Sequence, residues 1–356
     1  MERITLNMSL IRFNCDYTEG AHPEIIRLLA ETNMEQTVGY GEDEYCEKAR
    51  RLIQRDCGRE DIDVHFLVGG TQANLTLISA ALRAHQGAVA AATGHINVHE
   101  SGAIEATGHK VLTVPGDISG KLPAAGAEEI YSAHWGDETH EHMVQPKLVY
   151  ISDSTENGAV YTKAELAALS TVCRKHGLYL YLDGARLGYA LMSPKNDLTL
   201  KDLCDYCDAF YIGGTKVGAL FGEAMVITNP ALKEDFRYFI KQKGGMLAKG
   251  RLLGLQFAAL FENGLYYEIS KNAVDKACRI AEALMAEGVE FLAEPESNQI
   301  FPILENTVIE KLNEKYATAF WQKIDDRRSA VRICTSWATT DELTDGIINE
   351  ILSHLK

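Results

Sequence analysis

LYLYLD at residues 178–183 and AFYIGG at residues 209–214 are the stretches that decide the fold of this chain. Each is a nearly continuous apolar run, which is how strands buried on both faces of a parallel sheet read. The segment before the first of them, AELAALSTVCRKHG at 164–177, has helical apolar spacing, a basic last turn and a terminal glycine. We therefore predict that it is a crossover helix feeding the 178–183 strand.

The same alternation of strand-like and helical segments extends on both sides of these stretches. A helix is predicted after GGT at 69–71, and further strands are predicted at 64–68, 88–92, 109–114, 147–152 and 223–228. Alternating elements of this kind indicate an α/β fold in which helices cover a mainly parallel sheet.

The pattern changes after about residue 245. A long helical segment at 251–288 is followed by short strand-like pieces and a last helix from Asp341. We therefore predict a large domain over residues 1–245 and a smaller α/β domain over 246–356, with the N-terminal segment left open to join either. No low-complexity tract or Pro/Ser linker separates them, so the two should pack closely.

The composition limits the class of protein. Hydrophobic residues make up 46% and charged residues 24% of the 356 residues, as in a globular protein. No apolar run approaches the roughly 18 to 20 residues that a bilayer span needs, and the start of the chain lacks the pattern of an export signal. We therefore expect a soluble, cytoplasmic protein with its eight cysteines reduced. A net charge of −15 argues against nucleic acid or an anionic membrane as its main partner.

Four short motifs stand at predicted strand ends: GGT at 69–71, His95, DGAR at 183–186 and GGTK at 213–216. In open α/β sheets a ligand lies beyond the carboxyl ends of the strands, so these motifs should converge. The GGT motif stands between a strand and a helix, where free backbone N–H groups favour an anion such as phosphate. An ordinary turn is the alternative for GGT taken alone.

Asp183 and Lys216 carry the chemistry that this convergence suggests. A carboxylate at a buried strand end needs a cation, and the protonated ring nitrogen of pyridoxal 5′-phosphate (PLP) is one. Lys216 lies in an apolar, glycine-rich stretch that can lower an amine's pKa enough to make it a nucleophile. The alternatives are a capping aspartate and a solvated lysine. Arg186 and Arg332 offer planar forks for a carboxylate, with ordinary salt bridges as the alternative.

Two polar clusters suggest metal or redox chemistry only weakly. Cys204-x-x-Cys207 has no second Cys pair after it and runs into a strand, so buried free thiols are expected. The histidines and acids between residues 134 and 142 lack a helical ligand spacing. We therefore predict no metal site.

The chain resembles the L-threonine aldolase and aromatic amino acid β-eliminating lyase family of fold-type I PLP enzymes over nearly its whole length. GHIN, TENG and VYT place it nearest the phenylserine-aldolase-like branch. The resemblance implies the aspartate aminotransferase fold, a PLP-dependent transferase-like α/β fold with a large and a small domain. The matching stretches are NCDYTEGAHPEI, YGEDEYC, GGTQAN, GHINVHESGA, STENGAVYT, YLDGARLGYAL, GGTKVG and VRICTS.

The resemblance also implies roles for single residues. Lys216 is expected to hold PLP as a Schiff base, with Asp183 at the ring nitrogen and His95 stacked on the ring. Arg186 and Arg332 are expected to hold the substrate carboxylate. The other expected cofactor contacts are Gly70, Thr71, Arg186, Thr215 and, across a subunit boundary, Lys249; Tyr40 is expected to enter a neighbouring site.

Two positions depart from the family pattern. Glu156 stands where the best-known threonine aldolases have a histidine, and Cys15 stands where they have a serine. Both are expected near the substrate, and either Glu156 or His95 is a candidate catalytic base.

The implied reaction is cleavage of L-threonine, L-allo-threonine or a β-aryl serine to glycine and an aldehyde. β-Elimination of cysteine, serine or tryptophan to pyruvate and ammonia is the alternative, since it would use the same PLP-binding residues. A nucleotide-binding dehydrogenase or binding protein is a third possibility, but the first strand-helix unit lacks a GxGxxG turn. The family implies a homodimer or homotetramer whose active sites are completed by a neighbouring subunit.

Overall fold

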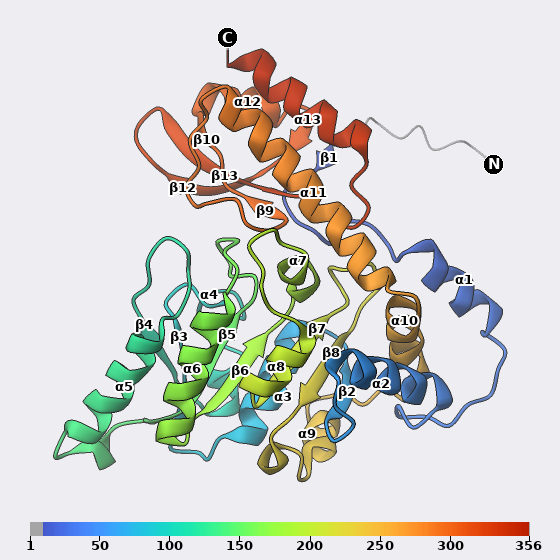
Figure 1. Ribbon diagram of the computed structural model, residues 1–356, viewed down its shortest axis with the longest axis vertical. Helices are drawn as coiled ribbons and strands as arrows, with labels where there is room; N and C mark the ends of the chain where they lie inside the picture. Colours follow the sequence, from blue (N-terminus) through green and yellow to red (C-terminus); the bar gives the residue numbers. More distant parts are fainter. Residues whose placement is uncertain (1–9, 356) are drawn as a thin grey trace.

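The computed structural model describes residues 10–355, which form a large sheet with covering helices and a smaller sheet above it (Figure 1). The strands of the large sheet lie in the order β2-β8-β7-β6-β5-β3-β4. Their bounds are β2 Asp63–Leu67, β3 Gln86–Ala91, β4 Val111–Val114, β5 Gln145–Ser152, β6 Tyr179–Asp183, β7 Ala209–Gly213 and β8 Glu223–Ile227.

All seven strands predicted for this sheet are confirmed, with ends shifted by three residues or fewer. The sheet is mainly parallel, as predicted, because β8 is the strand that runs antiparallel to both of its neighbours. Strands β7 and β8 are joined by a short connection, which brings the chain back in the opposite direction. A parallel neighbour would have needed a crossover of a dozen or more residues.

Helices cover both faces of the large sheet, and each face has its own core. Along β6, Leu180 and Leu182 point into one apolar cluster, while Tyr181 points into the other. This alternation follows from the two-residue period of a strand. The helices are α2 Glu44–Cys57, α3 Gly70–Ala81, α4 His95–Val98, α5 Ala124–Gly136, α6 Lys163–His176, α7 Leu187–Leu191, α8 Leu200–Tyr206, α9 Phe236–Gln242 and α10 Arg251–Glu262.

The crossover helix α6 has well-defined ends, and its prediction is confirmed. Thr162 and Glu165 form a reciprocal capping box at its start. Gly177 ends it with φ of 64°, a left-handed conformation that glycine adopts without steric cost. The chain then enters β6 directly, as the apolar pattern predicts.

The helical segment predicted over 251–288 is confirmed, but it consists of two helices, α10 and α11 (Leu265–Ala286), with a break that was not predicted. Gly264 has φ of 75°, which a helix interior does not allow. Helix α10 packs against α2, where a Cβ on Gly254 would lie 2.4 Å from Cys46 Cα. Helix α11 then runs from the large sheet toward the small one (Figure 1).

The smaller sheet is antiparallel, with β13 between β10 and β12 and also paired with β9. The first described strand, β1, pairs in parallel with β11, so the N-terminal segment begins beside the small sheet. The domain boundary at residues 245 and 246 stays a prediction. The remaining bounds are α1 Pro23–Glu31, β1 Ile11–Arg12, β9 Gln299–Ile300, β10 Ile303–Glu305, α12 Asn306–Leu312, β11 Tyr316–Ala317, β12 Ala319–Lys323, β13 Arg328–Cys334 and α13 Asp341–His354.

Within residues 10–355, no helix combines the length and apolar character that crossing a membrane would require.

Candidate active site

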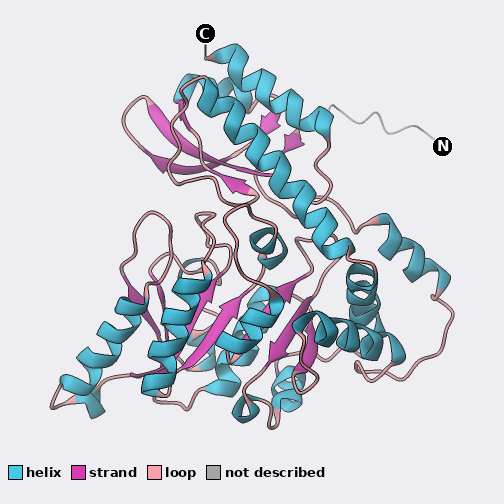
Figure 2. Ribbon diagram, viewed as in Figure 1, coloured by secondary structure: helices cyan, strands magenta, loops and turns pink. Residues whose placement is uncertain are grey.

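A cavity of about 340 Å³ lies at the carboxyl ends of the parallel strands. Figure 2 shows loops and the short helix α7 in this region, between the large sheet and the small one. The cavity brings together eight residues that the sequence singles out: Gly70, Thr71, His95, Glu156, Asp183, Arg186, Thr215 and Lys216. Their location agrees with the expected convergence of the motifs, and their individual roles stay predictions.

Asp183, the last residue of β6, is held by four hydrogen-bond donors. Its Oδ2 accepts from Tyr150 at 2.6 Å and from Asn74 at 2.9 Å. Its Oδ1 accepts from the Tyr211 hydroxyl and from the backbone N–H of Ala185. Burial by itself would raise the pKa of Asp183, but nearby His95 and these hydrogen bonds lower it below its ordinary value. Asp183 is therefore a buried anion that lines the cavity.

Two glycines allow the Asp183 and Lys216 motifs to lie side by side. A Cβ on Gly184 would stand 1.9 Å from the backbone oxygen of Tyr211, and one on Gly213 would stand 2.4 Å from that of Ala185. Real Cβ atoms do not approach backbone oxygens so closely. The glycines of DGAR and GGTK are thus required by the contact between their own two turns.

Lys216 is half-buried in the cavity wall. Burial and the nearby Arg186 guanidinium lower the pKa of its amine. A larger neutral fraction makes the amine a better nucleophile toward a carbonyl group. The Tyr189 hydroxyl donates to the backbone oxygen of Lys216, which fixes the turn that carries the side chain.

The start of α3 provides the anion-binding end of the cavity. Gly69 caps this helix of 12 residues in an extended conformation, and Gly70 and Thr71 form its first turn at the cavity wall. Free N–H groups and the helix dipole favour a phosphate there. A Cβ on Gly70 would lie 2.8 Å from the Tyr211 hydroxyl oxygen, so glycine also keeps α3 close to the sheet.

Glu223 is a cavity residue that was not predicted from the sequence. It begins β8, and its carboxyl group accepts from Thr215 Oγ1 at 2.8 Å and from the Gly214 N–H at 3.1 Å. Burial raises the pKa of Glu223 to about 8, so at neutral pH the group is mostly protonated. It therefore adds little negative charge to the cavity. The sequence does not indicate that Glu223 lines a cavity, because its pattern predicts only the first residue of a strand.

His95 is oriented by a buried carboxylate. Its Nδ1 lies 2.8 Å from Glu100 Oε1, which also accepts from Asn74 Nδ2 at 2.7 Å. Asn74 in turn donates to Asp183, so a hydrogen-bonded chain joins Asp183 to His95. The motifs GGTQAN and GHINVHESGA contain Asn74 and Glu100, but sequence alone does not show that these two side chains meet.

Glu156 follows β5 and borders the cavity beside His95. Its Oε1 accepts from the backbone N–H of His95 at 2.9 Å and from the Ser152 hydroxyl at 2.8 Å. Within residues 10–355 its Oε2 has no hydrogen-bond partner. Burial raises the pKa of Glu156. One carboxyl oxygen is thus fixed to the protein, while the other remains free for a ligand.

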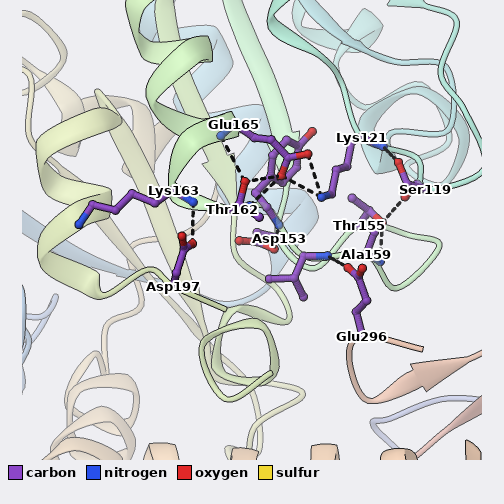
Figure 3. Close-up of polar contacts among 12 residues, drawn as sticks. Ser119, Lys121, Asp153, Thr155, Ala159, Thr162, Lys163, Glu165, Asp197 and Glu296 are labelled. Atoms are coloured by element: carbon purple, nitrogen blue, oxygen red, sulfur yellow. Dashed lines mark hydrogen bonds and ion pairs between the residues drawn. The ribbon is translucent and has the colours of Figure 1, made fainter. Parts of the chain in front are cut away.

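The loop that presents Glu156 is anchored on several sides, as Figure 3 shows. Thr155 Oγ1 donates to the Ser119 backbone oxygen at 2.6 Å. The backbone N–H of Val160 donates to Glu296 Oε2 at 2.8 Å, which ties the loop to the C-terminal part of the chain. Ion pairing between Lys121 and Glu165, at 2.9 Å, closes the cluster at the start of α6. These contacts restrict the motion of the Glu156 carboxyl group.

A second cavity of about 380 Å³ shares His95, Glu156, Arg186 and Lys216 with the first and adds residues from the small sheet. Arg332 lines it, and its Nη2 donates to the Asn14 backbone oxygen at 2.8 Å. The Arg332 guanidinium lies 5.2 Å from the centre of the Trp321 ring. Two arginines therefore border the region next to Lys216: Arg186 from the turn after β6, and Arg332 from β13 of the small sheet.

Three predicted site residues lie outside these cavities. Cys15 is buried beside them but lines neither. Tyr40 and Lys249 are exposed, and the Tyr40 N–H donates to the Ala248 backbone oxygen at 3.3 Å. These two residues therefore lie together on the surface, away from the cavity of their own chain.

The two polar clusters considered in the sequence, Cys204-x-x-Cys207 and the histidines and acids between residues 134 and 142, are not arranged around a common metal position. Among residues 10–355, no group of three or more His, Cys, Asp or Glu side chains is arranged to hold a metal ion. Cys204 and Cys207 are buried free thiols.

The side chains of the first cavity fit PLP. Asp183 offers a buried anion for the ring nitrogen, Lys216 an amine for the aldehyde, and the start of α3 an anion site for the phosphate. The His95 imidazole stands at the same cavity, held by Glu100.

Comparison with known proteins supports this fit. A low-specificity L-threonine aldolase from a Pseudomonas species is 30% identical over 93% of this chain and 94% of its own length. A solved threonine aldolase structure from Leishmania major is 47% identical, covers 97% of this chain and 100% of its own, and has a TM-score of 0.94. An aspartate aminotransferase from Thermus thermophilus, 13% identical with a TM-score of 0.71, shows the fold alone, over 98% of this chain and 92% of its own.

The fold is thus the aspartate aminotransferase fold, as the resemblance implied. A family model described as beta-eliminating lyase matches residues 13–307, which is most of the chain. From the match and the cavity together, we conclude that this chain belongs to the beta-eliminating lyase family of PLP-dependent enzymes.

Proposed function

We propose that this enzyme cleaves L-threonine, L-allo-threonine or a related β-hydroxy-α-amino acid to glycine and an aldehyde. The observation that carries the proposal is the position of Glu156, whose free carboxyl oxygen borders the same cavity as Lys216 and the two arginines. The names of the similar proteins, low-specificity L-threonine aldolases and a threonine aldolase, support the same reaction.

The cofactor is PLP, and we propose that Lys216 holds it as a Schiff base. When bound, PLP supplies an electron sink for the pair of electrons left on Cα when a bond to that carbon breaks. Asp183 keeps the ring nitrogen protonated because its own carboxylate is an anion of lowered pKa. His95, held by Glu100, is proposed to cover one face of the ring.

Arg186 and Arg332 are proposed to bind the carboxylate of the amino acid. With that carboxylate fixed, the substrate cannot rotate freely, and the Cα–Cβ bond is presented for cleavage. Glu156 then takes the proton of the β-hydroxyl group as the Cα–Cβ bond breaks. The β-carbon leaves as an aldehyde, and Cα takes up a proton to become glycine.

Glu156 is proposed as the base in preference to His95. The Nδ1 of His95 is engaged by Glu100, and its ring is needed at the cofactor. Glu156 keeps one oxygen free, and burial raises its pKa above that of an ordinary carboxyl group, which makes its carboxylate a stronger base. The anchored loop holds that oxygen in place.

We further infer that the enzyme is a homodimer or homotetramer, located in the cytoplasm. Tyr40 and Lys249 support the oligomer, since they are exposed together and do not line their own cavity, as expected of residues that serve a neighbouring site. Light scattering on the purified protein gives the number of subunits. A monomer with full activity would contradict the inference.

The experiment for the main proposal compares wild type with Lys216→Ala, using the exposed Lys311→Ala as a control. Wild type and the control should be yellow, from the bound cofactor, and should convert L-threonine to glycine and acetaldehyde. Lys216→Ala should lose both the visible absorbance and the turnover. A Lys216→Ala protein that keeps both would overturn the assignment.

β-Elimination is the second candidate, and the description of the matching family model is the reason to test it. The same purified enzyme should be offered L-cysteine and L-serine, with pyruvate and ammonia as the products measured. We expect the rate with L-threonine to exceed both. Pyruvate formation from cysteine at a higher rate than glycine formation from threonine would assign the enzyme to β-elimination instead.

A further inference from the structure

We propose that Asp16 is a positioning residue for the substrate carboxylate: it holds Arg186 so that one edge of the guanidinium remains free in the cavity. The inference rests on the proposed function only in taking an α-amino acid as the ligand. Asp16 was not predicted as a site residue from the sequence, where it stands between Cys15 and Tyr17 in the N-terminal segment.

The contact between Asp16 and Arg186 is bidentate and buried. Arg186 Nε donates to Asp16 Oδ2 at 2.8 Å, and Nη2 donates to Oδ1 at 3.0 Å. The Asp16 side chain is fully buried. Within residues 10–355, Arg186 Nη1 has no hydrogen-bond partner and is not enclosed by protein, while Arg186 lines both cavities. Asp16 therefore occupies one edge of the guanidinium and leaves Nη1 for a ligand.

Asp16 is itself fixed from the C-terminal part of the chain. Asn298 Nδ2 donates to Asp16 Oδ2 at 2.9 Å and also to the Thr335 backbone oxygen at 2.9 Å. Although burial would raise the pKa of Asp16, the Arg186 charge and these hydrogen bonds lower it well below its ordinary range. The group is thus an anion under all ordinary conditions, held from two directions.

The short segment before Asp16 also reaches the second arginine. The Phe13 N–H donates to the Ala317 oxygen at 2.9 Å, and the Cys334 N–H donates to the Phe13 oxygen at 2.7 Å. The next residue, Asn14, accepts from Arg332 Nη2. One segment of the chain therefore contacts both proposed carboxylate-binding groups, although Arg186 follows a strand of the large sheet and Arg332 lies in the small one.

The charges at this position match a single carboxylate. Two guanidinium groups and the Asp16 carboxylate together carry one positive charge. An amino acid's α-carboxylate neutralises it, whereas a neutral amide would leave it uncompensated in a partly buried site. An arrangement serving only the fold would not need a guanidinium edge that stays open to the cavity. Asp16 should accordingly decide how well the enzyme separates a carboxylate from an amide.

The test measures ligand selectivity in the PLP-loaded enzyme. Glycine and glycinamide are titrated separately, and the change in the visible absorbance of the cofactor gives a Kd for each. Wild type should bind glycine more tightly than glycinamide. In Asp16→Asn the amide NH2 cannot accept from Arg186, so the guanidinium is no longer held by two hydrogen bonds. Although this variant leaves more positive charge, the preference for glycine should fall about 10-fold or more, because the hydrogen bond from a positioned guanidinium to the ligand carboxylate is lost.

Three further measurements separate positioning from a general structural effect. Asp275→Asn, which removes an exposed carboxylate paired with Lys271, should keep the wild-type preference. In Asp16→Asn, KM for L-threonine should rise at least 10-fold while kcat stays within about threefold, with the same visible absorbance before ligand is added. Asn298→Ala, which removes the support of Asp16 together with one hydrogen bond to the Thr335 backbone oxygen, should change the preference in the same direction by a smaller factor.

The possible outcomes either overturn the proposal or support it. An unchanged preference for glycine in Asp16→Asn would overturn it, and so would an equal loss of affinity for both ligands. If Asp16→Asn does not fold, Asn298→Ala decides: unchanged selectivity in that variant overturns the proposal, and reduced selectivity supports it. If wild type fails to cleave L-threonine but still prefers glycine, and Asp16→Asn loses that preference, then the proposed function fails and this inference stands.

Discussion

The two halves of the active-site region are built in different ways. The cofactor half, formed by Gly70, Thr71, Asp183 and Lys216, stands on strand ends and the turns that follow them. The carboxylate half, formed by Asp16, Arg186, Asn298 and Arg332, depends on contacts between distant segments. The bond from Arg332 to Asn14 spans 318 positions in the chain. Reactive groups thus sit on the rigid sheet, and ligand recognition is assembled where the two sheets meet.

Buried carboxyl groups in and near these halves fall into two electrostatic classes. Asp183 and Asp16 have hydrogen-bond donors on both oxygens and a cationic neighbour, and their pKa values are lowered. Glu156, Glu223 and Asp153 have fewer donors, and burial raises their pKa values. The first class is fixed as anions that bind cations. The second class keeps a proton to a higher pH than an ordinary carboxyl group does, and within it Glu156 is placed to exchange one with a substrate.

Among substitutions that leave the cofactor bound, the largest effect on turnover is expected for Glu156→Gln, which tests the second class. A glutamine can keep the contacts with His95 and Ser152 but cannot take a proton. Removing a general base typically costs about 10²- to 10⁴-fold in rate, so kcat for L-threonine should fall within that range. The visible absorbance of the bound cofactor should remain.

The control for Glu156 is Glu105→Gln, at an exposed position outside both cavities. Its kcat should equal that of wild type. If Glu156→Gln retains kcat within about threefold, the base lies elsewhere, and His95 becomes the next residue to replace.

Asp183→Asn should produce the next largest effect and tests the cofactor half. The variant removes the anion proposed to face the ring nitrogen while keeping a similar shape for Tyr150 and Tyr211. Loss of one electrostatic partner of this kind typically costs about 10²- to 10³-fold in kcat. Equilibrium dialysis should also show weaker binding of PLP. Unchanged kcat and PLP affinity would remove Asp183 from the cofactor site.

Arg332→Lys should have a smaller effect, confined to the carboxylate half. Lysine keeps the charge but cannot provide a planar fork, and it would lose the contact with Asn14. KM for L-threonine should rise about 10- to 100-fold, which corresponds to one lost charge-assisted hydrogen bond. PLP affinity, measured by dialysis, should not change. If this substitution released PLP, Arg332 would also serve the cofactor, and the two halves would not be separate.

The difference between the halves also explains what the sequence could predict. The cofactor half could be predicted because a strand, a turn and a helix start are local patterns, and the sheet brings their ends together. The Gly264 break was missed because a single glycine within a long helical pattern does not by itself show a positive φ. The predicted segment 251–288 was otherwise helical.

The carboxylate half was only partly accessible from sequence. Arg186 and Arg332 were found because arginine suits a carboxylate, but Asp16 was missed because its partner lies 170 positions away. Glu100 and Glu223 were missed because an acidic residue is ordinarily exposed. Only the tertiary structure shows that these two are buried. Long-range pairing leaves no local pattern to read.

The smallest effect on activity is expected for Asp153→Asn, which sharpens the comparison of the two carboxyl classes. Asp153 is buried behind the cofactor half and lines neither cavity; its Oδ1 accepts from the Tyr161 N–H at 3.3 Å, a contact that asparagine can keep. Burial raises the pKa of Asp153 to about 8, from an ordinary value of 3.8. The folded protein therefore holds a proton that the unfolded chain releases between these pH values, so raising the pH through this window destabilises the fold by up to ~1.4 kcal/mol per pH unit.

Melting temperatures of the PLP-loaded protein at pH 5, 6.5 and 8 measure this dependence. The wild-type melting temperature should fall toward pH 8, and that of Asp153→Asn should fall less, with kcat near the wild-type value. Asp61→Asn is the matched control, because the Arg59 hydrogen bond lowers the pKa of Asp61 to about 2 and its charge is constant over this range. It should therefore keep the wild-type slope. Equal slopes in wild type and Asp153→Asn would mean that Asp153 is ionised in the folded protein and belongs with Asp183 and Asp16.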